Sequence, residues 1–138
     1  MRNGVIGVAR WVTEIGRSNV VLAIANEYGH DDFNHPILKT PEGQAELIRL
    51  AKQTAPQMHV ATSGGGGDML YDEVAQASDF SLIHYNHASL EAIPHRIAAL
   101  KKDSKPVVCN ESEKVGMEGT KAAESSVVNV EILRTDGS

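Results

Sequence analysis

The 138-residue sequence contains little of what marks several large classes of protein. Its single cysteine, Cys109, has no partner for an internal disulfide, so a small disulfide-stapled fold is excluded. Acidic residues outnumber basic ones, and a formal net charge of −5 without a basic cluster argues against a nucleic-acid partner. Apolar runs stay below the roughly 18 residues that a membrane-spanning helix needs, so we expect no membrane partner.

The N-terminal segment lacks the uncharged apolar centre of a signal peptide, because Arg10, Glu14 and Arg17 interrupt it. Its apolar residues recur at helical spacing, which predicts an amphipathic helix over about residues 4–17. Trp11 falls on a stripe of this helix where we expect core packing. A secreted parent that had lost its leader would give the same pattern, so the sequence leaves the localisation unknown.

The rest of the chain alternates apolar strand-like runs with helical segments. We predict strands over residues 19–25, 58–62, 80–85, 107–109 and 127–133, and helices over 4–17, 40–54, 69–77, 90–102 and 117–126. This order predicts an α/β fold in one domain, with a parallel sheet of four to five βα units. The sheet is either open and doubly wound or an arc of a (β/α)8 barrel. Residues 133–138 are expected to form a disordered tail.

Two of the predicted strands end in the same dipeptide. The apolar run NVVLAIA, expected to be buried on both faces, leads into Asn26-Glu27, and KPVVC leads into Asn110-Glu111. In a parallel sheet these ends share an edge, so Glu27 and Glu111 are predicted to meet. Glycoside hydrolysis needs such a pair, because one carboxyl protonates the leaving oxygen while the other attacks or stabilises the anomeric carbon. Strand ends often carry polar residues, however, so both acids could be ordinary solvated side chains.

Three segments resemble the clan A retaining glycoside hydrolases, the cellulase- and mannanase-like TIM barrels. VVLAIANEYG is similar to the fourth strand of that family, FSLIHYN to the sixth and KPVVCNE to the seventh, with MHVAT between the first two. The resemblance covers about residues 5–116. It implies a partial (β/α)8 TIM barrel that spans strands 4 to 7.

The resemblance also implies a role for each residue. Glu27 would be the general acid/base and Glu111 the nucleophile, while Asn26 would bind a sugar hydroxyl beside the scissile bond. His84 or Tyr85 would contact substrate and orient Glu111, and because neighbours on a strand face opposite ways, we expect only one to do so from the strand. The implied substrate is a polysaccharide or oligosaccharide, hydrolysed with retention and with no cofactor or metal.

The chain departs from this family in ways that leave a second hypothesis open. It has no counterpart to the first three strands and no clear eighth-strand tryptophan, and an aromatic content of 4% offers few platforms for sugars. The sequence therefore predicts part of a hydrolase. The competing hypothesis is a non-catalytic α/β module that self-associates through open barrel edges, or pairs with a missing half-barrel, with Glu27 and Glu111 as relics.

Other motifs favour structural interpretations. SGGGGD at residues 63–68 is a candidate flexible βα loop rather than a phosphate cradle, because it lacks the Gly-Lys-Ser/Thr ending of a P-loop. No common zinc spacing fits the loop that carries His30, Asp31, Asp32 and His35. We expect Cys109 to be a buried, inert thiol.

Overall fold

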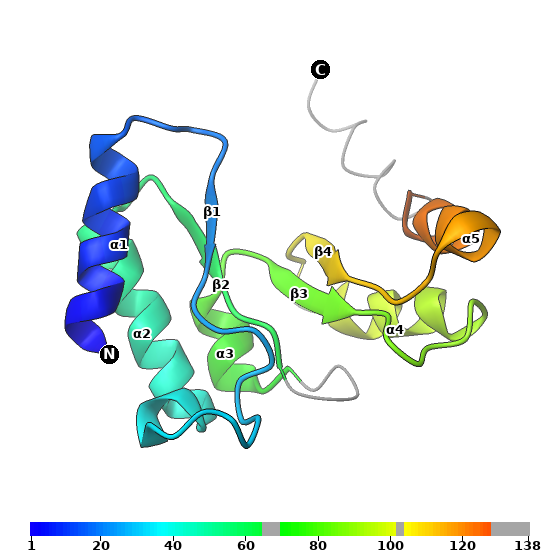
Figure 1. The fold of residues 1–138 in the computed structure, drawn as a ribbon, viewed down its shortest axis with the longest axis horizontal. Helices are drawn as coiled ribbons and strands as arrows, with labels where there is room; N and C mark the ends of the chain where they lie inside the picture. Colours follow the sequence, from blue (N-terminus) through cyan, green and yellow to red (C-terminus); the bar gives the residue numbers. More distant parts are fainter. Residues whose placement is uncertain (65–69, 102–103, 128–138) are drawn as a thin grey trace.

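The computed structural model describes residues 1–64, 70–101 and 104–127, with side chains described through residue 124 (Figure 1). The helices are α1 (Arg2–Glu14), α2 (Pro41–Thr54), α3 (Asp72–Ala77), α4 (Ala92–Leu100) and α5 (Gly116–Val127), with a 3-10 turn η1 (Pro36–Leu38). The strands are β1 (Val21–Ala23), β2 (His59–Ala61), β3 (Ser81–His84) and β4 (Val107–Glu111). Each strand is followed by a helix. No described helix has both the length and the apolar character needed to cross a bilayer.

The four strands form two parallel pairs, β1 with β2 and β3 with β4. A parallel bridge between Ser63 and Leu82, and a hydrogen bond of 2.9 Å from the Asp79 N–H to the Val60 carbonyl, connect β2 to the β3 side. The predicted α/β fold with parallel strands is confirmed, but the described residues form two pairs where we predicted one sheet. Residues 128–133 of the expected fifth strand, and the expected tail, lie outside the described residues.

Helix α2 begins where the sequence predicts. The Thr40 hydroxyl accepts a hydrogen bond of 3.1 Å from the Gly43 N–H, Pro41 opens the helix and Glu42 lies in its first turn. The helix packs against both α1 and α3 (Figure 1). It therefore forms the centre of the helical layer behind β1 and β2.

The core consists mainly of two apolar clusters, one behind each strand pair. Helices α1 and α2 contribute to the first, together with β1 and β2, through residues that include Ala9, Val12, Ile48, Ala51 and Val60. The second lies between β3, β4, α4 and α5 and includes Ile83, Tyr85, Ile93, Ile97 and Leu100. Helices cover only one side of each pair. The residues of the candidate active site, described in the next subsection, lie on the other side.

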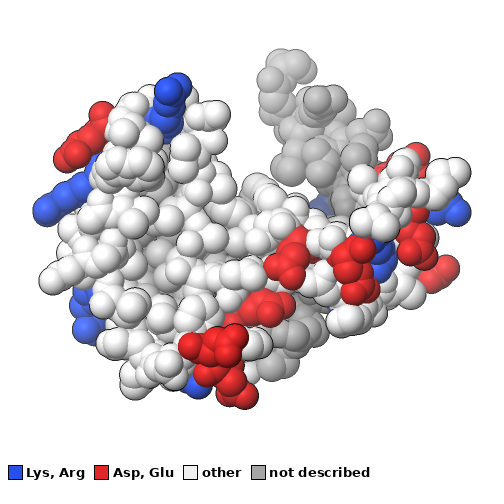
Figure 2. Space-filling model, in the orientation of Figure 1, with Lys and Arg blue, Asp and Glu red and all other residues white. Residues whose placement is uncertain are grey.

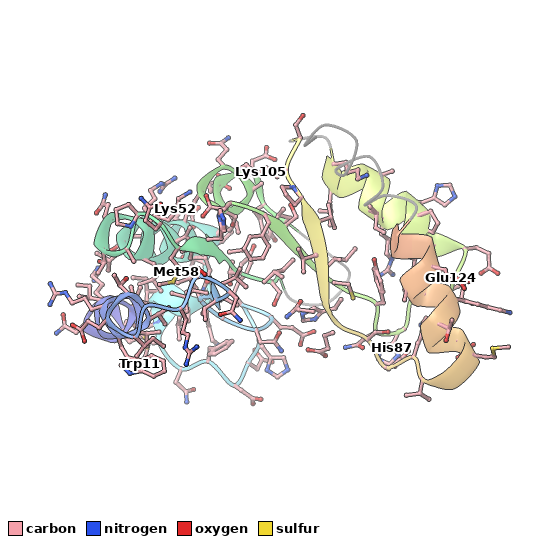
Figure 3. All side chains as sticks on the ribbon, turned by 90° about the horizontal axis from the view of Figure 1, so that it is seen from above. Trp11, Lys52, Met58, His87, Lys105 and Glu124 are labelled. Carbon is pink, nitrogen blue, oxygen red and sulfur yellow. The ribbon has the colours of Figure 1, made fainter. Side chains whose placement is uncertain are left out.

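Two sequence expectations about burial were wrong. Strand β1 is not buried on both faces, because Leu22 packs against the first cluster while Val21 is 57% exposed. Trp11 is 58% exposed on the outer side of α1 instead of in the core (Figure 3). The reason is that α1 turns Ala9 and Val12 toward the core, which leaves the neighbouring stripe with Trp11 facing outward.

Candidate active site

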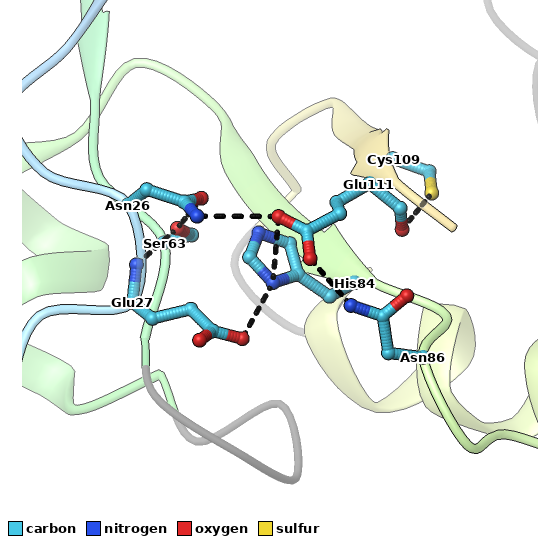
Figure 4. Close-up of polar contacts among 7 residues, drawn as sticks. All are labelled: Asn26, Glu27, Ser63, His84, Asn86, Cys109 and Glu111. Atoms are coloured by element: carbon cyan, nitrogen blue, oxygen red, sulfur yellow. Dashed lines mark hydrogen bonds and ion pairs between the residues drawn. The ribbon is translucent and has the colours of Figure 1, made fainter. Parts of the chain in front are cut away.

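The carboxyl ends of three strands converge on two acids and a histidine (Figure 4). Glu27 follows β1, His84 ends β3 and Glu111 ends β4, and one donor atom of each lies within 4.8 Å of the other two. His84 Nδ1 is 3.0 Å from Glu27 Oε1 and 3.9 Å from Glu111 Oε2. The structure thus brings together the two acids that the sequence paired, while their chemical roles stay predictions.

A β-bulge in β4 turns Glu111 toward His84. Ile83 pairs with Cys109, but the next pair is His84 with Glu111, so Asn110 is the extra residue. Cys109 packs against the cluster under α4 and is half-buried rather than fully buried as expected. Without the extra residue, Glu111 would alternate onto the same helix-covered face as Cys109.

Two asparagine amides hold the Glu111 carboxylate. Asn26 Nδ2 donates to Oε2 at 3.2 Å, and Asn86 Nδ2 donates to Oε1. The hydrogen bond from Asn26, then that from Asn86, and the nearby His84 hold the pKa of Glu111 below the ordinary glutamate value. Glu111 is therefore a carboxylate at neutral pH.

Glu27 adopts a backbone conformation that few residues with side chains adopt. Its φ is +52°, in the left-handed region. Its N–H donates to Ser63 Oγ at 2.9 Å, and the Tyr28 N–H donates to the Ser63 carbonyl at 3.0 Å. Such a conformation persists where surrounding contacts enforce it. The turn directs the Glu27 carboxylate, 31% exposed, toward His84.

The His84 ring lies mostly under the surface, with 9% of its side chain exposed. Its Nε2 is buried and has no hydrogen-bond partner among the described residues. The neutral tautomer with the proton on Nδ1 donates to Glu27 and leaves only an acceptor at Nε2. It thereby avoids burying an unpaired N–H donor.

Of the two residues proposed to orient Glu111, His84 has its ring beside the carboxylate, whereas the Tyr85 backbone N–H donates to the Glu111 carbonyl at 2.9 Å. Tyr85 is 3% exposed in the apolar cluster with Ile83, because alternation places it on the helix-covered face. Asn86 contacts Glu111 instead, and the sequence analysis missed it. The available signal was its place directly after the predicted strand FSLIHY.

Glu113, two residues after Glu111, makes a different set of contacts. It accepts a hydrogen bond of 2.7 Å from the His87 backbone N–H, while Lys114 Nζ donates to the Tyr85 carbonyl at 3.3 Å. These contacts join the loop after β4 to the loop after β3. Acidic side chains gather over the lower middle and right of the face in Figure 2, whereas most basic side chains on that face lie toward its left and top.

Glu27, His84 and Glu111 are also the described residues whose donor atoms come nearest to a metal-ligand set. Their donor atoms lie within 4.8 Å of one another, and His84 Nδ1 is 3.9 Å from Glu111 Oε2. Ligands about 2.1 Å from a tetrahedral zinc lie only about 3.4 Å apart, so these side chains would have to close inward. At these separations the three side chains do not form a tetrahedral zinc site without moving.

Comparisons with known protein families, with curated proteins and with solved structures found no match. Function is therefore inferred from the residues and contacts themselves.

Replacing Glu27 by glycine should give a more stable protein than replacing it by alanine. Both changes remove the carboxylate, but alanine keeps the left-handed penalty of roughly 1–2 kcal/mol. The greater unfolded-state freedom of glycine offsets about 0.5–1 kcal/mol of that difference. In urea denaturation, the free energy of unfolding of Glu27→Gly should therefore exceed that of Glu27→Ala by about 0.5–1 kcal/mol.

Glu113 provides the matched control, because its φ is not positive. There the order should reverse, with Glu113→Ala more stable than Glu113→Gly. If Glu27→Ala equalled or exceeded Glu27→Gly in stability, the backbone of Glu27 would not be strained.

Proposed function

We propose that Glu27 and Glu111 are the catalytic pair of a retaining glycoside hydrolase that cleaves O-glycosyl bonds of a polysaccharide or oligosaccharide. The observation that carries the proposal is the approach of two strand-end carboxylates, with donor atoms within 4.8 Å. Retaining enzymes hold their carboxyl groups about 5–5.5 Å apart, whereas inverting enzymes leave about 6.5–9.5 Å for a water. Oxygens within 4.8 Å of each other are compatible with the retaining separation, and the choice of retention follows the resemblance.

The unequal surroundings of the two acids support a different role for each. Glu111 accepts hydrogen bonds from two amides that lower its pKa, which suits a nucleophile that must be ionised. Glu27 contacts a different partner, His84 Nδ1 at 3.0 Å, and its side chain is 31% exposed, which suits a group that exchanges protons with substrate and water. Environment and resemblance therefore point to the same assignment.

The reaction then follows in two balanced steps. Glu111 attacks the anomeric carbon while protonated Glu27 gives its proton to the departing glycosidic oxygen, and a glycosyl ester forms on Glu111. Water next attacks the same carbon as Glu27 takes a water proton, which breaks the ester and restores the Glu111 carboxylate. Asn26 donates a hydrogen bond to Glu111, and it is the residue to which the resemblance assigns a contact with a sugar hydroxyl.

We further infer that β1 to β4 are consecutive strands in an arc of a (β/α)8 barrel. The Ser63–Leu82 bridge supports the order β1-β2-β3-β4, because it aligns the end of β2 parallel to β3. The alternation of strands and helices supports it too, as does the position of the acids at the carboxyl ends of strands. Closure of such a barrel requires four further strands.

A 2-deoxy-2-fluoro glycosyl fluoride should leave a covalent sugar on Glu111. The ring fluorine disfavours the oxocarbenium-like transition states while the fluoride leaving group lets the first step proceed, so the ester accumulates. Glucosyl, mannosyl and xylosyl forms serve as the panel because the sugar is unidentified. Intact-protein mass followed by peptide mapping measures the adduct.

Two variants separate the nucleophile from its neighbour. Glu111→Gln should abolish labelling, and Glu113→Gln should label as the unaltered protein does, because Glu113 serves the loop contact with His87. Labelling that survives Glu111→Gln, or no labelling with any sugar of the panel, would contradict the proposal.

A second candidate role, the self-associating module, is favoured by exposed apolar side chains. Helix α1 and its C-cap residue present Val8, Trp11 and Ile15, which are 44%, 58% and 43% exposed. Val21 on the outer edge of β1 is 57% exposed, and an apolar groove lies between this strand and α1. An exposed apolar face beside an unpaired strand edge favours association.

Sedimentation velocity over a range of protein concentrations tests this role. Self-association through α1 predicts a sedimentation coefficient that rises with concentration and a shift toward monomer in Trp11→Glu. Asn3→Glu, which adds the same charge to an exposed position of α1 off this stripe, should associate like the unaltered chain. A monomer at every concentration would refute the self-association role.

A further inference from the structure

Ser63 lies just after the carboxyl end of β2, beside Asn26 and Glu27 (Figure 4). It is 1% exposed, which makes it inaccessible as a nucleophile. Its backbone is fastened to the turn that carries Glu27, because its N–H donates to the Ala25 carbonyl at 3.4 Å and its carbonyl accepts from the Tyr28 N–H at 3.0 Å. Ser63 thus holds the chain on both sides of Asn26-Glu27.

The Ser63 hydroxyl makes two contacts that together fix its direction. Its Oγ accepts the Glu27 N–H at 2.9 Å and lies 3.3 Å from Asn26 Oδ1. A backbone N–H can only donate, so the Ser63 oxygen acts as acceptor there and its own proton points to Asn26. Asn26 Oδ1 is then the acceptor of that proton.

This direction determines which end of the Asn26 amide faces Glu111. An asparagine side chain has an acceptor at one end and a donor at the other, and it can present either by turning about χ2. With Oδ1 held by Ser63, Nδ2 faces Glu111 and donates to Oε2 at 3.2 Å. In the reverse orientation a carbonyl oxygen would face the carboxylate and repel it.

We propose that Ser63 is a positioning residue for the reaction, whose hydroxyl takes its direction from the Glu27 N–H and orients the Asn26 amide toward Glu111. This relay of hydrogen bonds runs from the Glu27 backbone N–H, through the side chains of Ser63 and Asn26, to the Glu111 carboxylate. Its catalytic meaning rests on the proposed function, but the hydrogen bonds themselves need no substrate.

The buried contacts of the preceding residue hold Ser63 in place. Thr62 Oγ1 accepts the Ala25 N–H at 3.2 Å and lies 2.9 Å from Gln44 Oε1, while Gln44 Nε2 donates to the Leu38 carbonyl at 3.1 Å. Thr62 and Gln44 are both fully buried. A satisfied buried network of this kind restricts movement of the strand end, so the position of Ser63 is set from α2.

The titration of the Glu111 carboxyl carbon, followed by NMR, tests the relay. In Ser63→Ala the Asn26 amide loses the partner of its oxygen, so its hydrogen bond to Glu111 weakens and the pKa of Glu111 should rise. The increase in the Glu111 pKa in Ser63→Ala should amount to most of the increase measured in Asn26→Ala. Because both changes act through one hydrogen bond, the double variant should add little to Asn26→Ala alone.

Two further variants exclude a general loosening of the fold. Ser78 is also buried, at 2% exposure, but its hydroxyl has no partner among the described residues, so Ser78→Ala should leave the Glu111 titration unchanged. Ser63→Cys keeps a similar volume with a weaker donor and should raise the pKa of Glu111 even if the alanine variant does not fold.

An unchanged Glu111 titration in Ser63→Cys, or an equal rise in Ser78→Ala, would overturn the inference. Glycosyl labelling is scored separately on the unaltered protein. If the sugar label forms but the Ser63 variants do not change the Glu111 titration, the relay is refuted and the proposed hydrolase function stands. If the Ser63 variants change the titration but no label forms, the relay stands and the proposed hydrolase function is refuted.

Discussion

Two carboxylates held close together repel each other, and the site depends on how the chain offsets that repulsion. Glu111 is stabilised by the amides of Asn26 and Asn86, and Glu27 by the imidazole of His84. These donors all lie at strand ends, as the acids do. The arrangement that brings the like charges together therefore also supplies the groups that stabilise them. It does so only while the two strand pairs keep their relative position, to which the bridge from Ser63 to β3 contributes.

One extra residue in β4 determines which way Glu111 faces. Because Asn110 is bulged, Glu111 lies opposite His84 instead of facing the helices. The left-handed turn at Glu27 has a similar effect after β1, where it directs the other carboxylate to the same place. Both are local departures from regular strand geometry, and bulges and strained residues of this kind concentrate at functional sites. The regular strands and helices form the scaffold. The bulge at Asn110 and the left-handed backbone of Glu27 direct the two carboxylates toward each other.

Local signals in the sequence were enough to predict the helices and the meeting of the acids. Thr40 and Pro41 set the start of α2 through contacts within a few residues, and parallel strands bring their carboxyl ends to one edge. The bulge, the relay through Ser63 and the exposure of Trp11 could not be predicted in this way. Each depends on contacts between segments far apart in the chain, or on which of two apolar stripes of α1 meets α2. Tyr85 illustrates the same limit, since alternation required only that it and His84 face opposite ways.

The central claim is that the amides of Asn26 and Asn86 hold Glu111 as a carboxylate, and the titration of the Glu111 carboxyl carbon measures this most directly. Carbon NMR across acidic and neutral pH should give Glu111 a pKa below the ordinary glutamate value. Asn86→Ala should raise that pKa, while Glu113→Gln should leave it unchanged. A Glu111 pKa at or above the ordinary glutamate value, unchanged by Asn86→Ala, would contradict the account.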